Sequence, residues 1–224
     1  MKTAAFILIC SAASLSAATF YSNDFSVNGG GFSVSSSANM GALNGWVSNP
    51  GVWSANGESV LGAASDSTLT SPVITVGGTG PVSLSFDHRF NFEFDGTRWD
   101  GGQVRVSVNG GAFTAVSNAQ LTNGYTGVIT GSGILNSQEG FNGISAGWAT
   151  GAYITTDANL GTFTAGTQLQ VQFVASWDEF QRGTPDNSLP GWELNSVTVN
   201  GVPEPGSALL LLGSLAMVAR RRRA

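Results

Sequence analysis

Apolar and polar residues alternate strictly along the middle of the chain. Between positions 82 and 94 the even residues are apolar or aromatic apart from His88, and the odd residues are polar. The same period of two recurs at 103–109, where the even positions are valines, and at 168–177, where the odd positions are apolar. Successive side chains of a strand point to opposite faces. The pattern therefore predicts three strands, each with one buried face and one face in water.

The remaining segments of the domain predict further strands and no long helix. Trp192 and Leu194 are apolar at even positions and Val197 and Val199 at odd positions, so a bulge is expected near residues 195–196 of a last strand at 192–199. Asn109-Gly110-Gly111 predicts a hairpin turn into a strand at 112–116. Other candidate strands are 20–26, 31–35, 52–53, 59–61 and 69–76, while 118–152 is glycine-rich and predicts long loops with short strands around 125–130.

Strands with one dry face each must bury those faces against one another. The expected fold class is therefore all-β, a two-sheet antiparallel sandwich. Four segments resemble the MAM-like or cleaved-adhesin jelly rolls of bacterial secreted proteins: Leu69-Thr70-Ser71-Pro72, residues 84–90 with Glu93, residues 100–107, and residues 191–197. The resemblance implies a jelly-roll-like arrangement and roles in adhesion or as accessory binding domains of enzymes. Asn195 and Ser196 stand where that family often has two aspartates.

Both ends of the chain carry apolar segments. Lys2, an apolar stretch at 4–9 and small residues up to Ala18 predict a signal peptide over 1–18, cleaved by signal peptidase after Ala18 or, as the second choice, after Ala17. The other interpretation is a buried N-terminal helix. The β-sandwich domain is then expected over 19–201.

Residues 202–224 resemble the PEP-CTERM sorting signal of Gram-negative bacteria. Pro203-Glu204-Pro205 is followed by an apolar run at 206–219 and by the four arginines Arg220, Arg221, Arg222 and Arg223. A helix of this run spans roughly 21 Å, less than the roughly 30 Å of a bilayer core, so we expect a short and temporary transmembrane anchor. The resemblance implies an exosortase-type membrane protease as partner. It also implies transient residence in the inner membrane and then the cell envelope or extracellular matrix.

Charge and cysteine content narrow the classes of function. The domain between the two ends holds four arginines and thirteen acidic residues, a net charge near −9, which argues against nucleic acid as a partner. Cys10 lies in the predicted signal peptide, so the domain has no thiol for catalysis and no disulfide. A single histidine and no other cysteine exclude a zinc site built from His and Cys ligands. We expect His88 to be a core residue bonded to the backbone.

Acidic residues suggest two kinds of site. Calcium binds six to eight oxygens, and the candidate ligands for a structural calcium are Asp24, Glu93, Asp95, Asp100 and Asp178. The alternative is solvated loop acids or ion pairs with Arg89, Arg98 and Arg182. Residues 93–95 also resemble the start of the Glu-x-Asp-x-x-Glu motif of laminarinase-like glycosidases, whose paired carboxylates act as nucleophile and acid. Arg98 stands at the third acidic position, which breaks that motif.

The polar faces of the strands are the last candidate. If the three regular strands share one sheet, their outward side chains form an amide-rich surface suited to sugar hydroxyls. Its candidate ligand-binding residues are Arg89, Asn91, Arg105, Gln170 and Trp99, and Trp46, Trp53 and Trp148 are further aromatic platforms. The other interpretation is a merely soluble face with tryptophans filling the sandwich ends. The expected function is a non-enzymatic structural or adhesive role associated with exopolysaccharide; the alternative is a carbohydrate-active enzyme.

Overall fold

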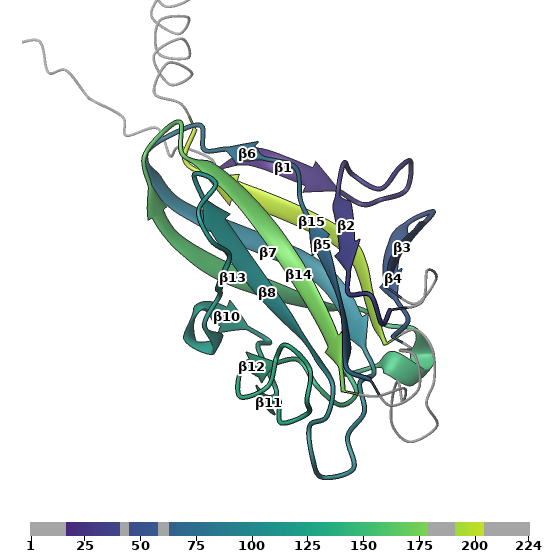
Figure 1. Ribbon diagram of the computed structural model, residues 1–224. Coiled ribbons are helices and arrows are strands. Elements are labelled where there is room, and N and C mark those ends of the chain that lie inside the picture. Colours follow the sequence, from purple (N-terminus) through teal and green to yellow (C-terminus); the bar gives the residue numbers. More distant parts are fainter. Residues whose placement is uncertain (1–16, 41–44, 58–62, 179–190, 204–224) are drawn as a thin grey trace, which may run out of the picture.

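The computed structural model describes residues 17–40, 45–57, 63–178 and 191–203. These residues form two antiparallel sheets that pack face to face (Figure 1). Sheet A contains β1 (Ala18–Asn23), β3 (Trp46–Asn49), β4 (Val52–Ala55), β7 (Gly80–Phe90), β10 (Leu121–Thr122), β13 (Ile154–Phe163) and β15 (Trp192–Gly201). Sheet B contains β2 (Ser33–Ser36), β5 (Ser65–Thr70), β6 (Ile74–Thr75), β8 (Gly101–Val108), β9 (Thr114–Ala115) and β14 (Gln168–Trp177).

The expected all-β, antiparallel architecture is confirmed. Along sheet A the order is β10-β13-β7-β15-β4-β3 with β1 also paired to β15, and along sheet B it is β2-β5-β14-β8-β9 with β6 paired to β14. Consecutive long strands alternate between the sheets, because β7, β13 and β15 lie in sheet A and β8 and β14 in sheet B. This alternation gives the jelly-roll-like connectivity that buries every dry face.

Smaller elements cover one end of the sandwich. β11 (Gly127–Val128) and β12 (Glu139–Gly140) form a separate two-stranded sheet within the region that predicted short strands. Two short 3₁₀ helices, η1 (Asn118–Gln120) and η2 (Trp148–Thr150), are the helices in the part of the chain that the structure describes. No helix among the described residues is long and apolar enough to span a membrane. The helices predicted within 1–18 and 206–219 fall almost entirely outside the described residues.

The core lies between the two sheets, where the predicted parity places it. Leu84 and Phe86 of β7 and Phe173 of β14 are fully buried, and the Phe86 and Phe173 rings meet edge to face with centroids 5.2 Å apart. Aromatic rings in this geometry contribute beyond the area they bury. The predicted bulge is confirmed by a register shift between Leu194 and Ser196 of β15.

Two strand predictions need adjustment. β7 ends at Phe90, four residues before the alternation ends, and the next residue, Asn91, forms an isolated bridge with Ile144. The predicted 69–76 strand is split, because Pro72 follows β5 and cannot donate to a ladder. The predicted hairpin is confirmed: Asn109 and Gly110 have φ of 51° and 73°, the left-handed conformation of a tight turn between β8 and β9. The strand predicted at 59–61 lies outside the described residues.

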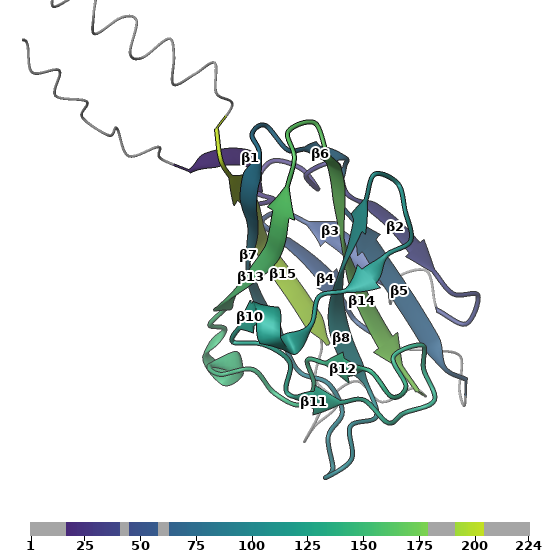
Figure 2. The same ribbon diagram turned by 90° about the vertical axis from the view of Figure 1, so that its left-hand side faces the viewer.

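The two chain ends of the domain lie side by side. Ala18 at the start of β1 pairs with Gly201 at the end of β15, and Figure 2 shows both segments at the same end of the sandwich. The predicted peptidase site and Pro203 are therefore close together, although residues 1–16 and 204–224 lie outside the described ranges.

Candidate functional site

The predicted single polar face is wrong. β7 lies in sheet A, whereas β8 and β14 are neighbours in sheet B, so Arg89 belongs to the opposite outer face from Arg105 and Gln170. The cause is the crossing of the chain from one sheet to the other between β7 and β8. Alternation tells which face of a strand is dry, and it carries no information on which sheet the strand joins.

Sheet B carries a continuous polar row on its outer face. The register aligns Ser33 of β2, Thr70 of β5, Gln172 of β14 and Arg105 of β8 across four neighbouring strands. Gln172 Nε2 donates to Thr70 Oγ1 at 3.1 Å. We call these four residues the sheet B row. It presents hydroxyl, amide and guanidinium groups side by side.

Neighbouring side chains hold the row in place. Arg105 Nε donates to Gln103 Oε1 at 2.8 Å, and an outer nitrogen of its guanidinium donates to Gln138 Oε1 at 3.5 Å. Gln170 Nε2 donates to the Ser71 carbonyl oxygen at 3.0 Å, so this predicted ligand residue lies beside the row with its amide already engaged. Burial lowers the pKa of Arg105, partly offset by Tyr125 and Asp66.

The segment that carries β11 and β12 covers one end of this face. Val174 of β14 points outward and is nevertheless fully buried, packed with Ile129 and Leu135 in a second small apolar cluster. Gln103 is also buried, and its Nε2 donates to the Glu139 carbonyl oxygen at 2.9 Å. The outer face of sheet B is therefore walled at one end, and the sheet B row lies next to this wall.

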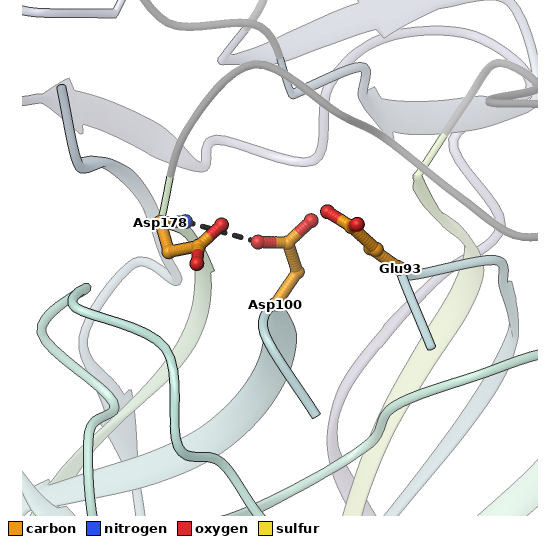
Figure 3. Close-up of side chains that lie close together, drawn as sticks. All are labelled: Glu93, Asp100 and Asp178. Atoms are coloured by element: carbon orange, nitrogen blue, oxygen red, sulfur yellow. Dashed lines mark hydrogen bonds between the residues drawn. The ribbon is translucent and has the colours of Figure 1, made fainter. Parts of the chain in front are cut away.

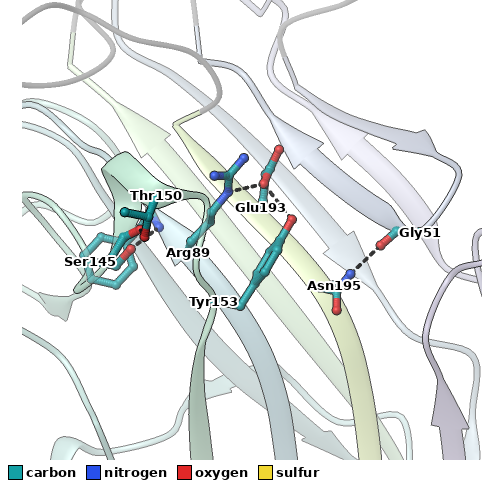
Figure 4. A network of polar contacts seen from close by, with 9 residues as sticks. Gly51, Arg89, Ser145, Thr150, Tyr153, Glu193 and Asn195 are labelled. Atoms are coloured by element: carbon teal, nitrogen blue, oxygen red, sulfur yellow. Dashed lines mark hydrogen bonds and ion pairs between the residues drawn. The ribbon is translucent and has the colours of Figure 1, made fainter.

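On sheet A, Arg89 is engaged in a compact aromatic and ionic cluster (Figure 4). Its Nε donates to Glu193 Oε2, and the Tyr153 hydroxyl donates to the same oxygen at 2.8 Å. The guanidinium carbon lies 4.9 Å from the centre of the Trp148 ring and 5.4 Å from that of Tyr153. The hydrogen bond to Glu193 raises the pKa of Arg89. Because its charge is compensated, Arg89 serves to fix the loop that carries η2.

The other predicted ligand residues are not on an open polar face. Asn91 is 1% exposed, because β7 has already ended where its side chain would have pointed outward. Trp99 lies in the β7–β8 loop and donates from Nε1 to Asp95 Oδ1 at 3.1 Å. Trp46 and Trp53 are buried. For those two residues the other interpretation, tryptophans that fill the sandwich, is correct.

His88 is a core residue, as predicted, but its partners are side chains. Trp192 Nε1 donates to His88 Nδ1 at 3.0 Å, so the imidazole proton is on Nε2 and is donated to Thr156 Oγ1 at 2.8 Å. The Thr156 hydroxyl in turn donates a hydrogen bond to the Asn123 carbonyl oxygen. Burial lowers the pKa of His88 to about 3. The ring is thus a neutral structural group with no access to a substrate.

The structure brings three of the five predicted metal ligands together. Carboxylate oxygens of Glu93, Asp100 and Asp178 all lie within 4.8 Å of one another. Asp24 and Asp95 do not belong to this cluster, which corrects the predicted set. Each closes a local turn instead: Asp24 Oδ1 accepts from the hydroxyl and amide of Ser26, and Asp95 Oδ1 accepts from the amide of Thr97. These hydrogen bonds lower the pKa of both carboxyls.

The cluster is a poor fit to glycoside hydrolysis. Both carboxyl groups of a glycosidase must reach the sugar, one on each side of the scissile bond. Asp100 is 0% exposed, and burial together with the nearby Asp178 and Glu93 raises its pKa well above the usual range. Three carboxylates packed this closely repel one another, and a cation placed between them removes that repulsion.

Sequence reasoning missed Asn142, a buried residue that donates from Nδ2 to the carbonyl oxygens of Glu93 and Asp100. It lies in the glycine-rich region that shows no periodicity, so no sequence signal singles it out. Of the predicted sorting residues, Pro203 is described, two residues after the end of β15. Glu204, Pro205 and Arg220–Arg223 lie outside the described residues.

Comparison with known proteins gives only distant similarities. No family model matches the sequence, and no curated protein does. One similar solved structure is the C-terminal CBM6 of LamC, a marine laminarinase from Zobellia galactanivorans. It is 14% identical with a TM-score of 0.32, covering 81% of this chain and 91% of that chain. Another is the carbohydrate-binding module CBM6cm-2 from Cellvibrio mixtus lichenase 5A in complex with cellotriose. It is 10% identical with a TM-score of 0.34, covering 83% and 99%. Similarity at this level assigns neither a ligand nor a function to this chain.

Proposed function

We propose that this chain is an exported, non-enzymatic protein that contacts neutral polysaccharide through the outer face of sheet B. The observation that carries the proposal is the sheet B row, in which Ser33, Thr70, Gln172 and Arg105 lie in register across four strands. Three inter-strand spacings make the row about 14 Å long, comparable with a short oligosaccharide. Hydroxyl, amide and guanidinium groups match the donors and acceptors of sugar hydroxyls.

The charge of the domain selects the kind of polymer. A net charge near −9 repels acidic chains, so the expected ligand is a neutral exopolysaccharide. The residues that form the row include no aromatic ring for a sugar to stack on, which implies weak binding per site. Weak contacts suit an adhesive or structural protein that is present in many copies, because linked weak contacts add up to strong attachment.

Export and sorting complete the proposal. Signal peptidase would remove residues 1–18, and an exosortase-type protease would process the chain near Pro203. The protein would then reside in the envelope or extracellular matrix of a Gram-negative bacterium after a transient stay in the inner membrane. The pairing of Ala18 with Gly201 supports this arrangement, because the signal peptide and the sorting segment would then leave the domain at one end and reach the same membrane.

The test is a glycan array with the purified full chain, run once with calcium and once with a chelator. Wild-type protein should bind neutral polysaccharide, and Gln172→Ala should weaken binding by about fivefold, the equivalent of one hydrogen bond of about 1 kcal/mol. Thr198→Ala, a part-exposed change on sheet A, is the matched control and should bind like wild type. Wild-type protein that binds no neutral glycan, or Gln172→Ala protein that binds as well as wild type, would contradict the proposal.

A further inference from the structure

Three strand ends meet where the carboxylates gather. Glu93 follows β7, Asp100 immediately precedes β8, and Asp178 immediately follows β14. β7 belongs to sheet A, and β8 and β14 belong to sheet B. The three side chains converge from these separate segments (Figure 3). A group bound among them would tie the two sheets together at this end of the sandwich.

The backbone around the cluster is held rigidly. Asn142 is 4% exposed, and its Nδ2 donates to the carbonyl oxygen of Glu93 at 2.9 Å and to that of Asp100 at 2.7 Å. One buried amide thus fixes the spacing of two carboxylate-bearing segments. The amide nitrogen of Asp178 donates to Asp100 Oδ1 at 2.9 Å, which fixes the third. The carboxylates are held close together despite their mutual repulsion, so the geometry is built into the fold.

One oxygen gives an independent sign of a missing partner. Asp100 is 0% exposed, and its Oδ2 is buried without a hydrogen bond among the described residues. Figure 3 shows this oxygen pointing towards Glu93, into the cluster. A buried polar atom without a partner costs free energy, and a buried carboxylate costs more. A protein does not keep such an oxygen beside two further carboxylates unless something compensates it.

We propose that Glu93, Asp100 and Asp178 bind one calcium ion that joins the two sheets. Two oxygens bound to the same calcium at about 2.4 Å can be at most about 4.8 Å apart, and the three carboxylates meet this limit. An all-oxygen set favours a hard cation over zinc. Magnesium demands shorter distances and stricter geometry, so it should bind more weakly. Second carboxylate oxygens and water complete the coordination.

The test measures calcium binding and stability on the full chain in mild detergent after removal of metal with a chelator. Calcium should raise the melting temperature, because an ion that binds only the folded state stabilises it. Terbium, a luminescent calcium substitute, should be sensitised by the neighbouring Trp99 and Trp177. Calcium should displace terbium, and magnesium should displace it only at higher concentration.

Asp100→Asn separates a metal site from a merely structural carboxylate. The amide keeps an oxygen for the Asp178 amide but removes the buried charge. The variant should melt higher than wild type in chelator, lose the rise with calcium, and bind terbium at least tenfold more weakly. Asp95→Asn is the matched control, since its carboxylate lies outside the cluster, and it should respond to calcium like wild type. Glu93→Gln is a second variant that should also lose the calcium response.

Two results would overturn the proposal. One is a wild-type melting temperature that does not change at millimolar calcium. The other is an undiminished calcium response in both Asp100→Asn and Glu93→Gln. The glycan array is a separate readout, so calcium binding without glycan binding would refute the proposed function alone, and glycan binding without calcium binding would refute this inference alone.

Discussion

Acid should destabilise this protein through one buried histidine. The pKa of His88 is lowered from 6.5 to about 3 by burial between the sheets. Below about pH 6.5 the unfolded chain takes up a proton at this position, and the folded chain does not until about pH 3. The unfolded state therefore binds more protons in this window, and stability must fall as the pH falls through it.

The magnitude follows from the two pKa values. Each pKa unit is worth about 1.4 kcal/mol, and a final pH of about 5 lies roughly 1.5 units below the pKa of an unfolded histidine. The loss from His88 is then about 2 kcal/mol, a large fraction of the stability of an ordinary domain. The buried Asp100 acts in the opposite direction, because its raised pKa favours the folded state at low pH.

Comparison with a variant isolates the histidine. His88→Phe keeps a ring in the core but leaves the indole N–H of Trp192 without an acceptor, so it should be less stable at every pH. Urea unfolding in chelator, followed by tryptophan fluorescence, measures both proteins at about pH 8 and about pH 5. The stability difference between them should shrink by about 2 kcal/mol at the lower pH. An unchanged difference would show that His88 is not the titrating group.

Two further substitutions test the packing and the backbone conformation, and a third tests the carboxylate cluster. Gly102→Ala places a methyl group 2.6 Å from a ring carbon of Trp192 and should lower the free energy of unfolding by about 1–3 kcal/mol in urea titrations. Gly110→Ala meets no atom within 4 Å, so only its φ of 73° opposes it, and about 1 kcal/mol should be lost in the same assay. Asn142→Ala removes two hydrogen bonds to the cluster backbone and should weaken terbium binding; luminescence titration unchanged from wild type would contradict this role.

The fold class could be predicted because the alternation of buried and exposed side chains can be read within each strand's own sequence. Every second residue from Val82 to Phe90 is buried in β7, as the alternation indicates. The bulge in β15 was likewise visible, since a phase change in one strand has few other causes. Sheet membership could not be predicted. The partners of β7 are β13 and β15, far away along the chain, and the sequence pattern of a strand does not identify its neighbours.

Most of the buried contacts that the sequence did not predict come from the glycine-rich region between 118 and 152. Phe141 is fully buried against Phe86 and His88, and the Tyr125 hydroxyl donates to the Val104 carbonyl oxygen. These contacts are made by single side chains from irregular loops, so no period reveals them. The available signal was the presence of Tyr125 and Phe141 in a stretch without periodicity, because large aromatic residues usually find a place in a core.

The acidic residues show what position along a strand can and cannot predict. Glu93, Asp100 and Asp178 each stand at the end or start of a predicted strand, so a common end of the sandwich was a reasonable expectation. Asp24 also follows a strand, but β1 pairs with the far part of β15, from Val197 to Gly201. Its carboxylate is used by Ser26 two residues later. Residues at strand ends come together only when those strand ends lie at the same end of the sandwich, whichever way the strands run.

The direction of the strands also gives the domain two unlike ends. β15 runs antiparallel to β7, so Gly201 and Ala18 lie near the start of β7, whereas Glu93 lies beyond its other end. Ten residue steps of β7 separate these ends by about 33 Å. In the proposed membrane-held precursor, both terminal segments would leave the domain at one end, and the proposed calcium site would close the end that points away from the membrane. The domain has no cysteine and therefore no disulfide at that end, and an ion bound to both sheets would help to hold that end closed.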